Sequence, residues 1–301
     1  MTADRTRAAL GIALAGFVSL SVGDAVVKSM AGAWPGTAVS ALRYCFGAIG
    51  LAAIVAATHG RAGFVLPKPG LQFGRGLAVA FATICFFMAV MALPLADATA
   101  IQFTSPILTA LLSPLVLGER TRPATWGATL LAFAGVLVVL RPNVLELGAW
   151  ALYPLGAAFG MSWLMMLNRR AAGAAPNAVM QFLLAAIAAP LILVAAFLLH
   201  AFGGPTFTIG WPGWIVAAKC LAVALFATLG HALIYAAATR ASASLVAPMT
   251  YVQLLVAAGI GWSLFGEAPD IATFGGAALI ILGGLWLWST QKAPMVAETP
   301  D

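Results

Sequence analysis

The sequence predicts an all-α polytopic membrane protein with ten transmembrane helices, arranged as two inverted five-helix repeats. Composition is the first reason, because 62% of the 301 residues are hydrophobic and only 8% are charged. A soluble domain carries about a quarter charged residues, so the mean hydropathy of +1.01 excludes an ordinary soluble fold. The second reason is that apolar runs of about 20 residues, the length that a helix needs to cross a bilayer, recur along the chain. The third is an internal repeat.

The internal repeat shows that the chain contains two copies of one unit. Residues 115–140 read LVLGERTRPATWGATLLAFAGVLVVL, and residues 263–288 read SLFGEAPDIATFGGAALIILGGLWLW. In each copy a Gly-Glu turn leaves one apolar helix, and a glycine-rich apolar helix follows. Aligned without a gap, the copies share Gly118/Gly266, Glu119/Glu267, Ala124/Ala272, Thr125/Thr273, Gly127/Gly275 and Gly135/Gly283.

Ten apolar spans follow from the hydropathy pattern, with short loops between most of them. They cover residues 8–28, 35–57, 72–93, 96–117, 123–141, 148–168, 176–199, 212–238, 242–265 and 270–289. The run after Arg5 and Arg7 resembles a signal peptide, but it is longer than the apolar region of one. We therefore assign it to the first helix.

The distribution of positive charge orients these spans. With both termini on one side, that side carries eleven of the 15 Lys and Arg residues. The other side carries two, Lys28 and Arg141, and the last two, Arg43 and Lys219, lie within spans. Because cytoplasmic loops are enriched in Lys and Arg, we expect both termini to be cytoplasmic.

The front halves of the two units match as well. Lys28 and Pro35 flank the turn after the first span, and Arg169 and Pro176 flank the turn after the sixth with the same spacing. Each unit therefore has five spans, and because five is odd the second unit is inserted upside down, as in many secondary transporters. The predicted division is a first repeat at 1–144, a second repeat at 145–290 and a cytoplasmic tail at 291–301.

Two five-helix units that each end in an LLxGE-like turn and a glycine-rich helix resemble the EamA-type transporters of the drug/metabolite transporter superfamily. Within it the chain is most similar to bacterial amino-acid exporters, including aromatic amino-acid exporters. The resemblance covers nearly the whole chain, and the paired Gly118-Glu119 and Gly266-Glu267 turns are its most specific part. It implies a bacterial inner-membrane protein whose central cavity is built by the first four helices of each unit.

The glycines and glutamates of these turns are predicted to be structural. Gly118 and Gly266 can supply the left-handed residue that ends a helix. Glu119 and Glu267 would stabilise the positive N-terminal end of the next helix. Because the repeats are inverted, the two glutamates lie at opposite membrane faces and cannot share a ligand.

Charged and titratable side chains inside the spans are candidates for a gate or charge pair, because a charge at membrane depth needs a cavity or a partner. For Asp24 and Arg43 the alternatives are a fixed bridge, Asp24 to Arg43 or Asp24 to Lys28, and a gate or a carboxylate receptor. Lys219 is close enough to the outside to extend its ammonium to the interface. His231 either carries a proton in a relay or packs with a hydrogen-bond partner.

Polar and aromatic side chains near the middle of the spans are predicted to line one central cavity. Pro106 leaves a backbone carbonyl without its helical partner, which is tolerated only against protein or a wet cavity. The inverted repeat places the fourth and ninth spans in equivalent positions, so their polar groups should converge. Ordinary helix packing is the alternative for each residue. The predicted cavity residues are Tyr44, Phe86, Phe87, Gln102, Ser105, Trp163, His231, Tyr235, Tyr251 and Gln253.

An aromatic, weakly polar pocket suits a small amphiphile, so we expect a secondary transporter that exports amino acids and related small metabolites by alternating access. The alternatives are export of other amphipathic metabolites or drugs, a passive channel, and an intramembrane enzyme. The sequence has no HExxH, GxSxG or Walker motif, so we expect no enzymatic activity, cofactor or metal. The expected partners are a small-molecule substrate and the lipid bilayer, with no nucleic acid; proton coupling and a homodimer are left open.

Overall fold

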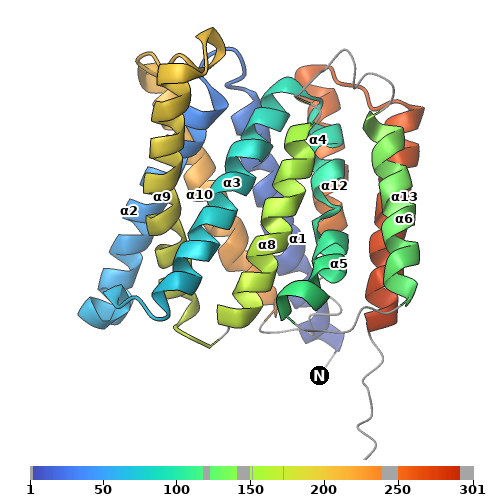
Figure 1. The fold of residues 1–301 in the computed structure, drawn as a ribbon, viewed down its shortest axis with the longest axis horizontal. Coiled ribbons are helices and arrows are strands. Elements are labelled where there is room, and N and C mark those ends of the chain that lie inside the picture. The colour runs from blue at the N-terminus through green and yellow to red at the C-terminus, as the bar shows by residue number, and fades with distance from the viewer. Residues whose placement is uncertain are drawn as a thin grey trace, which may run out of the picture.

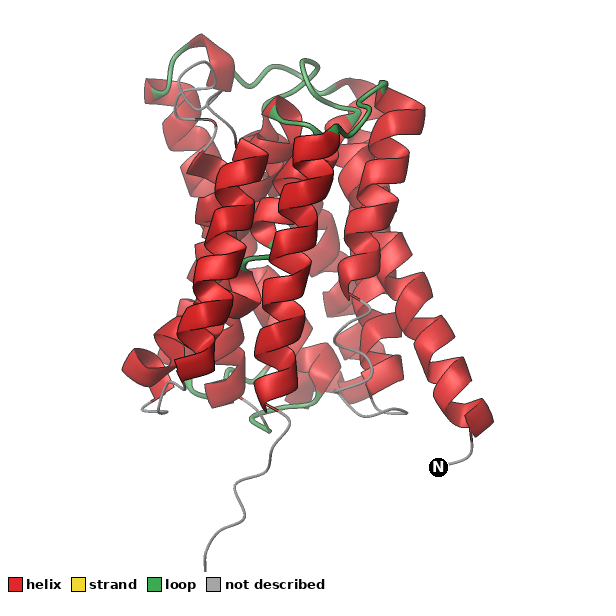
Figure 2. Ribbon diagram, turned by 90° about the vertical axis from the view of Figure 1, so that its right-hand side faces the viewer, coloured by secondary structure: helices red, strands yellow, loops and turns green. Residues whose placement is uncertain are grey.

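The computed structural model describes residues 3–117, 123–140, 150, 152–171, 173–238 and 250–291. Within these ranges the regular elements are all helices, and no strand occurs. The helices stand side by side in one bundle, with most connecting turns at its two ends (Figures 1 and 2). The predicted all-α class is therefore confirmed.

Helix boundaries follow the prolines of the sequence. Pro35, Pro94 and Pro176 directly precede α2, α4 and α9, and Pro123 opens α6, where a first helical turn tolerates proline. The helices are α1 (Ala3–Lys28), α2 (Gly36–His59), η1 (Gly60–Phe64), α3 (Pro69–Ala92), α4 (Leu95–Gln102), α5 (Ser105–Leu117), α6 (Pro123–Leu140), α8 (Tyr153–Ala171), α9 (Asn177–Phe202), η3 (Pro205–Phe207), α10 (Gly213–Ala238), α12 (Thr250–Phe265) and α13 (Ile271–Gln291).

The described helices include five that are long and apolar enough to cross a membrane. They are Ala8–Lys28, Gly36–Phe64, Pro69–Ala92, Asn177–Phe202 and Gly213–Ala237. Shorter apolar helices cover Trp126–Val139, Tyr251–Phe265 and Ile271–Trp286. Helix lies in every predicted span, although the ninth is described only from Thr250. The polytopic membrane class is confirmed, whereas the number ten stays a prediction.

The fourth span differs from its prediction. It is not one helix over residues 96–117 but two, α4 and α5, which are separated at residues 103–104. Pro106 explains the break, because it has no N–H for the carbonyl of Gln102 and its ring clashes with that carbonyl. Proline also disfavours a helical conformation at the preceding residue, Ser105. The interruption lies beside two predicted cavity residues, and interrupted helices build the binding sites of many transporters.

Helices of the two predicted repeats pack against each other in matched pairs. α1 packs on α10 and α3 packs on α8, while α2 pairs with α9, α4 with α12 and α6 with α13. These are the predicted spans 1 with 8, 3 with 6, 2 with 7, 4 with 9 and 5 with 10. If each span is replaced by its counterpart in the other unit, the same five pairs result. This symmetry is expected of two related units. The inverted orientation of the units stays a prediction.

The contact between α6 and α13, which lie side by side in Figure 1, reflects the repeat at single residues. A Cβ atom at Gly135 would lie 2.6 Å from the carbonyl oxygen of Gly276, and one at Gly283 would lie 2.9 Å from that of Ala128. The offset of the sequence repeat maps Gly135 onto Gly283 and Ala128 onto Gly276. Each contact is therefore the image of the other, and the small residues let the two backbones approach closely.

We expect Gly276→Ala to destabilise the fold and Gly275→Ala, its neighbour on the same helix, to be tolerated. A Cβ atom at Gly276 would lie 2.5 Å from Val139 Cγ2 and 2.6 Å from the Gly135 carbonyl oxygen, whereas Gly275 has nothing within 4 Å. Overpacking costs about 1–3 kcal/mol, while alanine in an open helical position gains up to about 1 kcal/mol over glycine. Thermal unfolding of the purified variants in detergent measures the difference, and equal midpoints would contradict this packing.

Candidate functional site

One face of α1 carries polar groups that contact α12. Ser21 and Asp24 are three residues apart, so they lie on the same side of the helix. Ser21 Oγ donates to the Gln253 carbonyl oxygen at 2.9 Å, and Gln253 Nε2 donates to Asp24 Oδ2 at 3.1 Å. The structure thus joins a predicted gating residue to a predicted cavity residue of the other repeat.

Arg43 of α2 supplies the positive charge of the same region. Its guanidinium carbon lies 4.6 Å from the ring centroid of Tyr44 and 5.5 Å from that of Phe87. Cation–π contacts of this kind favour a cation that has lost part of its hydration. The charge of Arg43 acts on both Asp24 and His231. Four other predicted site residues, Tyr44, Phe87, Asp24 and His231, therefore lie near this arginine.

Two predicted cavity residues, His231 and Tyr235, belong to α10. The side chain of His231 is exposed, although it lies within electrostatic reach of this internal arginine. Tyr235, one helical turn later, is 51% exposed. An exposed side chain on a membrane-spanning helix can face either lipid or a substrate path, so the cavity role of His231 and Tyr235 stays a prediction.

Tyr251 lies at a contact between helices. Its ring meets the ring of Phe103 edge to face, with centroids 6.0 Å apart and planes at 86°. Its hydroxyl lies against Gly284 of α13, where a Cβ atom could not fit. Tyr251 therefore packs between the break in the fourth span and the last helix of the chain.

The other predicted cavity residues are spread over several environments. Phe86 is buried in the same apolar cluster as Phe87. Trp163 stacks on Phe159 one turn earlier, with centroids 6.3 Å apart, and is 38% exposed. Ser105 is buried, and Gln102 is half-buried. A single cavity that includes all of them stays a prediction.

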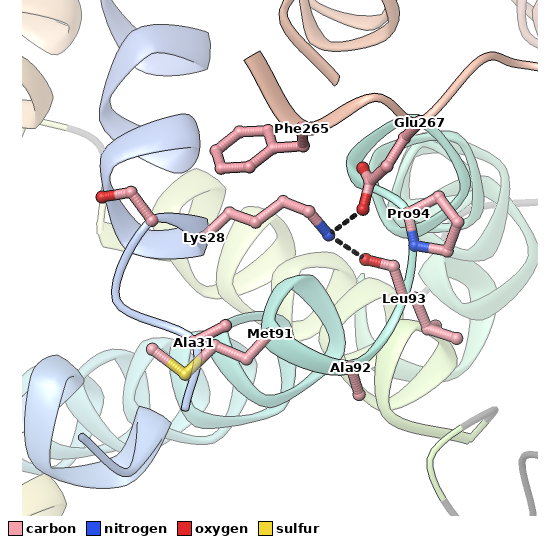
Figure 3. A pocket seen from close by; sticks show the side chains of 9 residues that line it. Lys28, Ala31, Met91, Ala92, Leu93, Pro94, Phe265 and Glu267 are labelled. Atoms are coloured by element: carbon pink, nitrogen blue, oxygen red, sulfur yellow. Dashed lines mark hydrogen bonds and ion pairs between the residues drawn. The ribbon is translucent and has the colours of Figure 1, made fainter. Parts of the chain in front are cut away.

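A second charged cluster lies at the Lys28 end of α1 (Figure 3). Lys28 Nζ lies 2.6 Å from Glu267 Oε1, and it donates to the carbonyl oxygens of Leu93 at 2.6 Å and Val90 at 3.2 Å. Glu267 Oε2 accepts the N–H of Leu95 at 3.1 Å. The Lys28 side chain is 9% exposed and that of Glu267 is 24% exposed. This pair connects α1, the end of α3, the start of α4 and the α12–α13 turn.

The cluster corrects two predictions. Glu267 does not cap α13, the helix that follows it, because Asp270 accepts the N–H of Thr273 at 2.9 Å in that role. Glu267 points instead to Lys28 and to the start of α4, where a buried ammonium needs a negative partner. The alternative bridge from Asp24 to Lys28 is not formed, because Lys28 binds Glu267 and Asp24 binds Gln253.

The glycine of the second turn has the conformation that the prediction requires. Gly266 has a φ of 69°, and its N–H bonds to the Trp262 carbonyl at 3.2 Å, so it ends α12 in the left-handed region. Its counterparts in the first repeat, Gly118 and Glu119, lie outside the described residues.

Two further basic residues connect helices near the ends of the bundle. Lys219 Nζ donates to the Ser29 carbonyl oxygen at 3.1 Å, which links α10 to the turn after α1. Arg75 is only 3% exposed; its Nε donates to Asn168 Oδ1 at 2.6 Å and its Nη1 to Gln72 Oε1 at 2.5 Å. The charge pattern predicted only that Arg75 lies at the inner membrane edge. It did not predict the hydrogen bond from Arg75 of α3 to Asn168 of α8.

Two other contacts were not predicted, although the sequence carries a signal for each. The spacing of Ser21, Asp24 and Lys28 places all three on one face of a helix, and this face contacts the α12 segment. Thr83 was not singled out, yet its Oγ1 lies 3.0 Å from the hydroxyl of Tyr44 and fixes that ring against α3. A hydroxyl in an apolar span is the signal, because it needs a partner there.

Comparison with known proteins gives a family and several relatives. Residues 7–141 match the model of the EamA-like transporter family. The chain is 26% identical over 307 residues to the pseudopaline exporter CntI of Pseudomonas aeruginosa (strain UCBPP-PA14), covering 97% of this chain and 100% of that one. It is 24% identical over 291 residues to the S-adenosylmethionine uptake transporter of Rickettsia prowazekii (strain Madrid E), covering 95% and 94%. It is 28% identical over 204 residues to the riboflavin transporter of Vibrio cholerae serotype O1, covering 66% and 65%.

A solved crystal structure shares the architecture. It superposes with a TM-score of 0.60 over 95% of this chain and 99% of that one, at 22% sequence identity. At this identity the likeness shows the fold alone. The named relatives carry three different metabolites and include both an exporter and an uptake transporter.

Proposed function

We propose that the chain is a member of the EamA-like transporter family, whose model matches residues 7–141, and that it carries amino acids and related zwitterionic metabolites across the bacterial inner membrane. Its family and relatives indicate a transporter of small metabolites rather than an enzyme. The zwitterionic substrate class and the outward direction are the parts that we add.

The placement of Asp24 and Arg43 carries this proposal. Their charges attract each other, but within the described residues no ion pair of 4.0 Å or less joins them. Two opposite charges at membrane depth that are near each other without a direct ion pair can bind the two ends of one zwitterion. Asp24 can accept hydrogen bonds from an ammonium, and Arg43 can donate two parallel bonds to a carboxylate.

The surroundings of this pair suit a substrate with an apolar side chain. Tyr44 and Phe87 place aromatic rings beside Arg43, and His231 and Tyr235 are exposed side chains on α10. Aromatic faces add about 0.5–1.5 kcal/mol to the contact with a bound ring. The break between α4 and α5 supports alternating access, because an interrupted helix offers free backbone groups and a flexible point.

The transport activity is tested with purified protein in liposomes. Uptake of labelled phenylalanine should saturate, and unlabelled phenylalanine should inhibit it, whereas protein-free liposomes should show neither effect. Flux that rises linearly with concentration would indicate a channel, and no flux for any amino acid would refute the proposal. Efflux from preloaded cells tests the direction, and an imposed proton gradient tests coupling through Asp24 and His231.

We also propose that both termini are cytoplasmic, as the charge distribution predicts. Gly173 and Gly204 lie in exposed turns that follow α8 and α9, so they should be on opposite sides of the membrane. A reporter fused at Gly173 should give a cytoplasmic signal, and one fused at Gly204 an external signal. The reverse pattern, or the same side for both, would overturn this topology.

A further inference from the structure

We propose that Lys28, Glu267 and the turn 93–95 form the outer gate of the transporter, and that the structure shows this gate closed. The inference rests on the proposed transport function and on cytoplasmic termini, which place the Lys28 end of α1 outside. Figure 3 shows the Lys28 side chain extending from α1 toward both Glu267 and Leu93.

The gate joins the two predicted repeats at one point. Lys28 and the turn 93–95 belong to the first repeat, and Glu267 belongs to the second. Alternating access requires contacts between repeats that break on one side of the membrane while the other side closes. An ion pair at the outer surface suits this role, because water can replace both partners when they separate.

The position of the pair places it on a path between the outside and Asp24. A cavity of about 490 Å³ at this end of the bundle is lined by Lys28, Glu267, Leu93 and Phe265 among others. The apolar cluster that contains Leu93 also includes Cys220, which is completely buried. Asp24 lies one turn deeper than Lys28, about 6 Å along the helix. A substrate that leaves Asp24 toward this cavity must therefore pass the ion pair and the apolar cluster.

The ion pair continues a polar contact that runs along α1. Ser21 and Asp24 bind Gln253 of α12, and Lys28 binds Glu267 just beyond the end of α12. These three α1 side chains span about 10 Å of helix at 1.5 Å per residue. Gln253 and Glu267 both lie in the second repeat, so opening the gate separates α1 from α12 over this length, while Lys28 can keep its bonds to the Val90 and Leu93 carbonyl oxygens.

The equivalent face of α8 forms weaker contacts at membrane depth. The spacing that relates Lys28 to Arg169 maps Ser21 onto Ser162 and Asp24 onto Met165. The Ser162 hydroxyl is buried and has no hydrogen-bond partner within the part of the chain that the structure describes. Met165 accepts only a long contact of 3.7 Å from Thr109 Oγ1. The mid-membrane contacts of α1 with α12 are therefore stronger than those of the equivalent residues of α8. This difference favours the state in which the outer side is closed.

The gate is tested by the accessibility of Cys220 from outside. Intact cells or oriented vesicles are treated with a membrane-impermeant methanethiosulfonate reagent, and mass spectrometry identifies the modified cysteine. Wild-type Cys220 should react slowly because it is completely buried. Glu267→Gln should raise its rate about tenfold or more, because the open population rises with the interaction free energy that is lost.

Asp270→Asn is the matched control. Asp270 lies in the same turn, the substitution removes the same charge, and asparagine caps a helix as well as aspartate does. Its Cys220 rate should equal that of the wild type. Equal rates for wild type, Glu267→Gln and Asp270→Asn would overturn the gate and leave the pair as a structural link.

A second variant distinguishes opening of the gate from misfolding of the Glu267→Gln protein. Lys28→Met combined with Glu267→Met replaces the pair by apolar side chains that can still pack. This protein should keep Cys220 protected and should transport more slowly than the wild type, because apolar contacts at this position do not exchange with water. Wild-type transport by this variant would also overturn the gate. The labelling needs no substrate, so it reports on the gate even if phenylalanine flux is absent.

Discussion

Arg43→Gln is expected to reduce transport of a zwitterionic substrate by roughly 10- to 100-fold, because a hydrogen bond to a charged group contributes about 1.5–3 kcal/mol. The guanidinium is held between the rings of Tyr44 and Phe87, and its charge acts on Asp24. Glutamine can still form hydrogen bonds, but it has neither the charge nor the planar fork that matches a carboxylate. Arg43→Lys keeps the charge without the fork, so its loss should be intermediate. Flux in liposomes at matched protein levels measures the series.

Arg61→Gln is the control for this series. It removes one positive charge from an exposed position in η1, so transport and stability should stay at the wild-type level. Arg43→Gln must also unfold at a temperature near that of the wild type, since a misfolded protein would lose flux for another reason. A folded Arg43→Gln protein with an unchanged half-saturation constant would remove Arg43 from the site.

Glu267→Gln should destabilise the protein more than Lys28→Met does. Without the carboxylate, Lys28 keeps its ammonium in a position that is 9% exposed, with only carbonyl oxygens and an amide as partners. Breaking a fully buried pair costs about 3–5 kcal/mol, and because Glu267 is 24% exposed we expect about 2 kcal/mol here. Lys28→Met leaves Glu267 with water and the Leu95 N–H, so its cost should be smaller.

The double variant Lys28→Met with Glu267→Met completes a set of four proteins, together with the wild type, Glu267→Gln and Lys28→Met. It should recover most of the stability, because well-packed apolar side chains often replace a buried ion pair without loss. Thermal unfolding in detergent at low and high salt measures all four proteins. Equal stability of Glu267→Gln and wild type would mean that Lys28 is hydrated rather than buried.

Features that depend on residues close together in the sequence could be predicted from it. The apolar runs predicted helices at the positions where they occur, and the paired turns predicted the left-handed Gly266. The depth of Asp24 and Arg43 marked them as charges that need partners, and the structure places them within electrostatic reach of each other. The helix and glycine predictions succeeded because an apolar run or a turn glycine determines the local backbone, whereas the role of Asp24 and Arg43 stays a prediction.

Choices between partners could not be predicted in the same way. Asp24 precedes Lys28 by one helical turn and was an obvious partner, but Glu267 reaches Lys28 from the other repeat. The broken fourth span has a similar cause. Pro114 and Pro190 stand inside α5 and α9 without ending them, whereas Pro106 separates α4 from α5. A proline can bend or break a helix, and the surrounding helices decide which occurs.

The central claim, that Asp24 and Arg43 bind the two ends of one zwitterion, is tested most directly by a series of three related competitors. Counterflow of labelled phenylalanine is measured in liposomes against phenylalanine, 2-phenylethylamine and 3-phenylpropanoate, which share the ring but carry both charges, only the ammonium or only the carboxylate. We predict that phenylalanine competes best and that each single-charge analogue is weaker by about tenfold or more, because it leaves either Asp24 or Arg43 without an opposite charge on the ligand. Equal competition by all three compounds would contradict it.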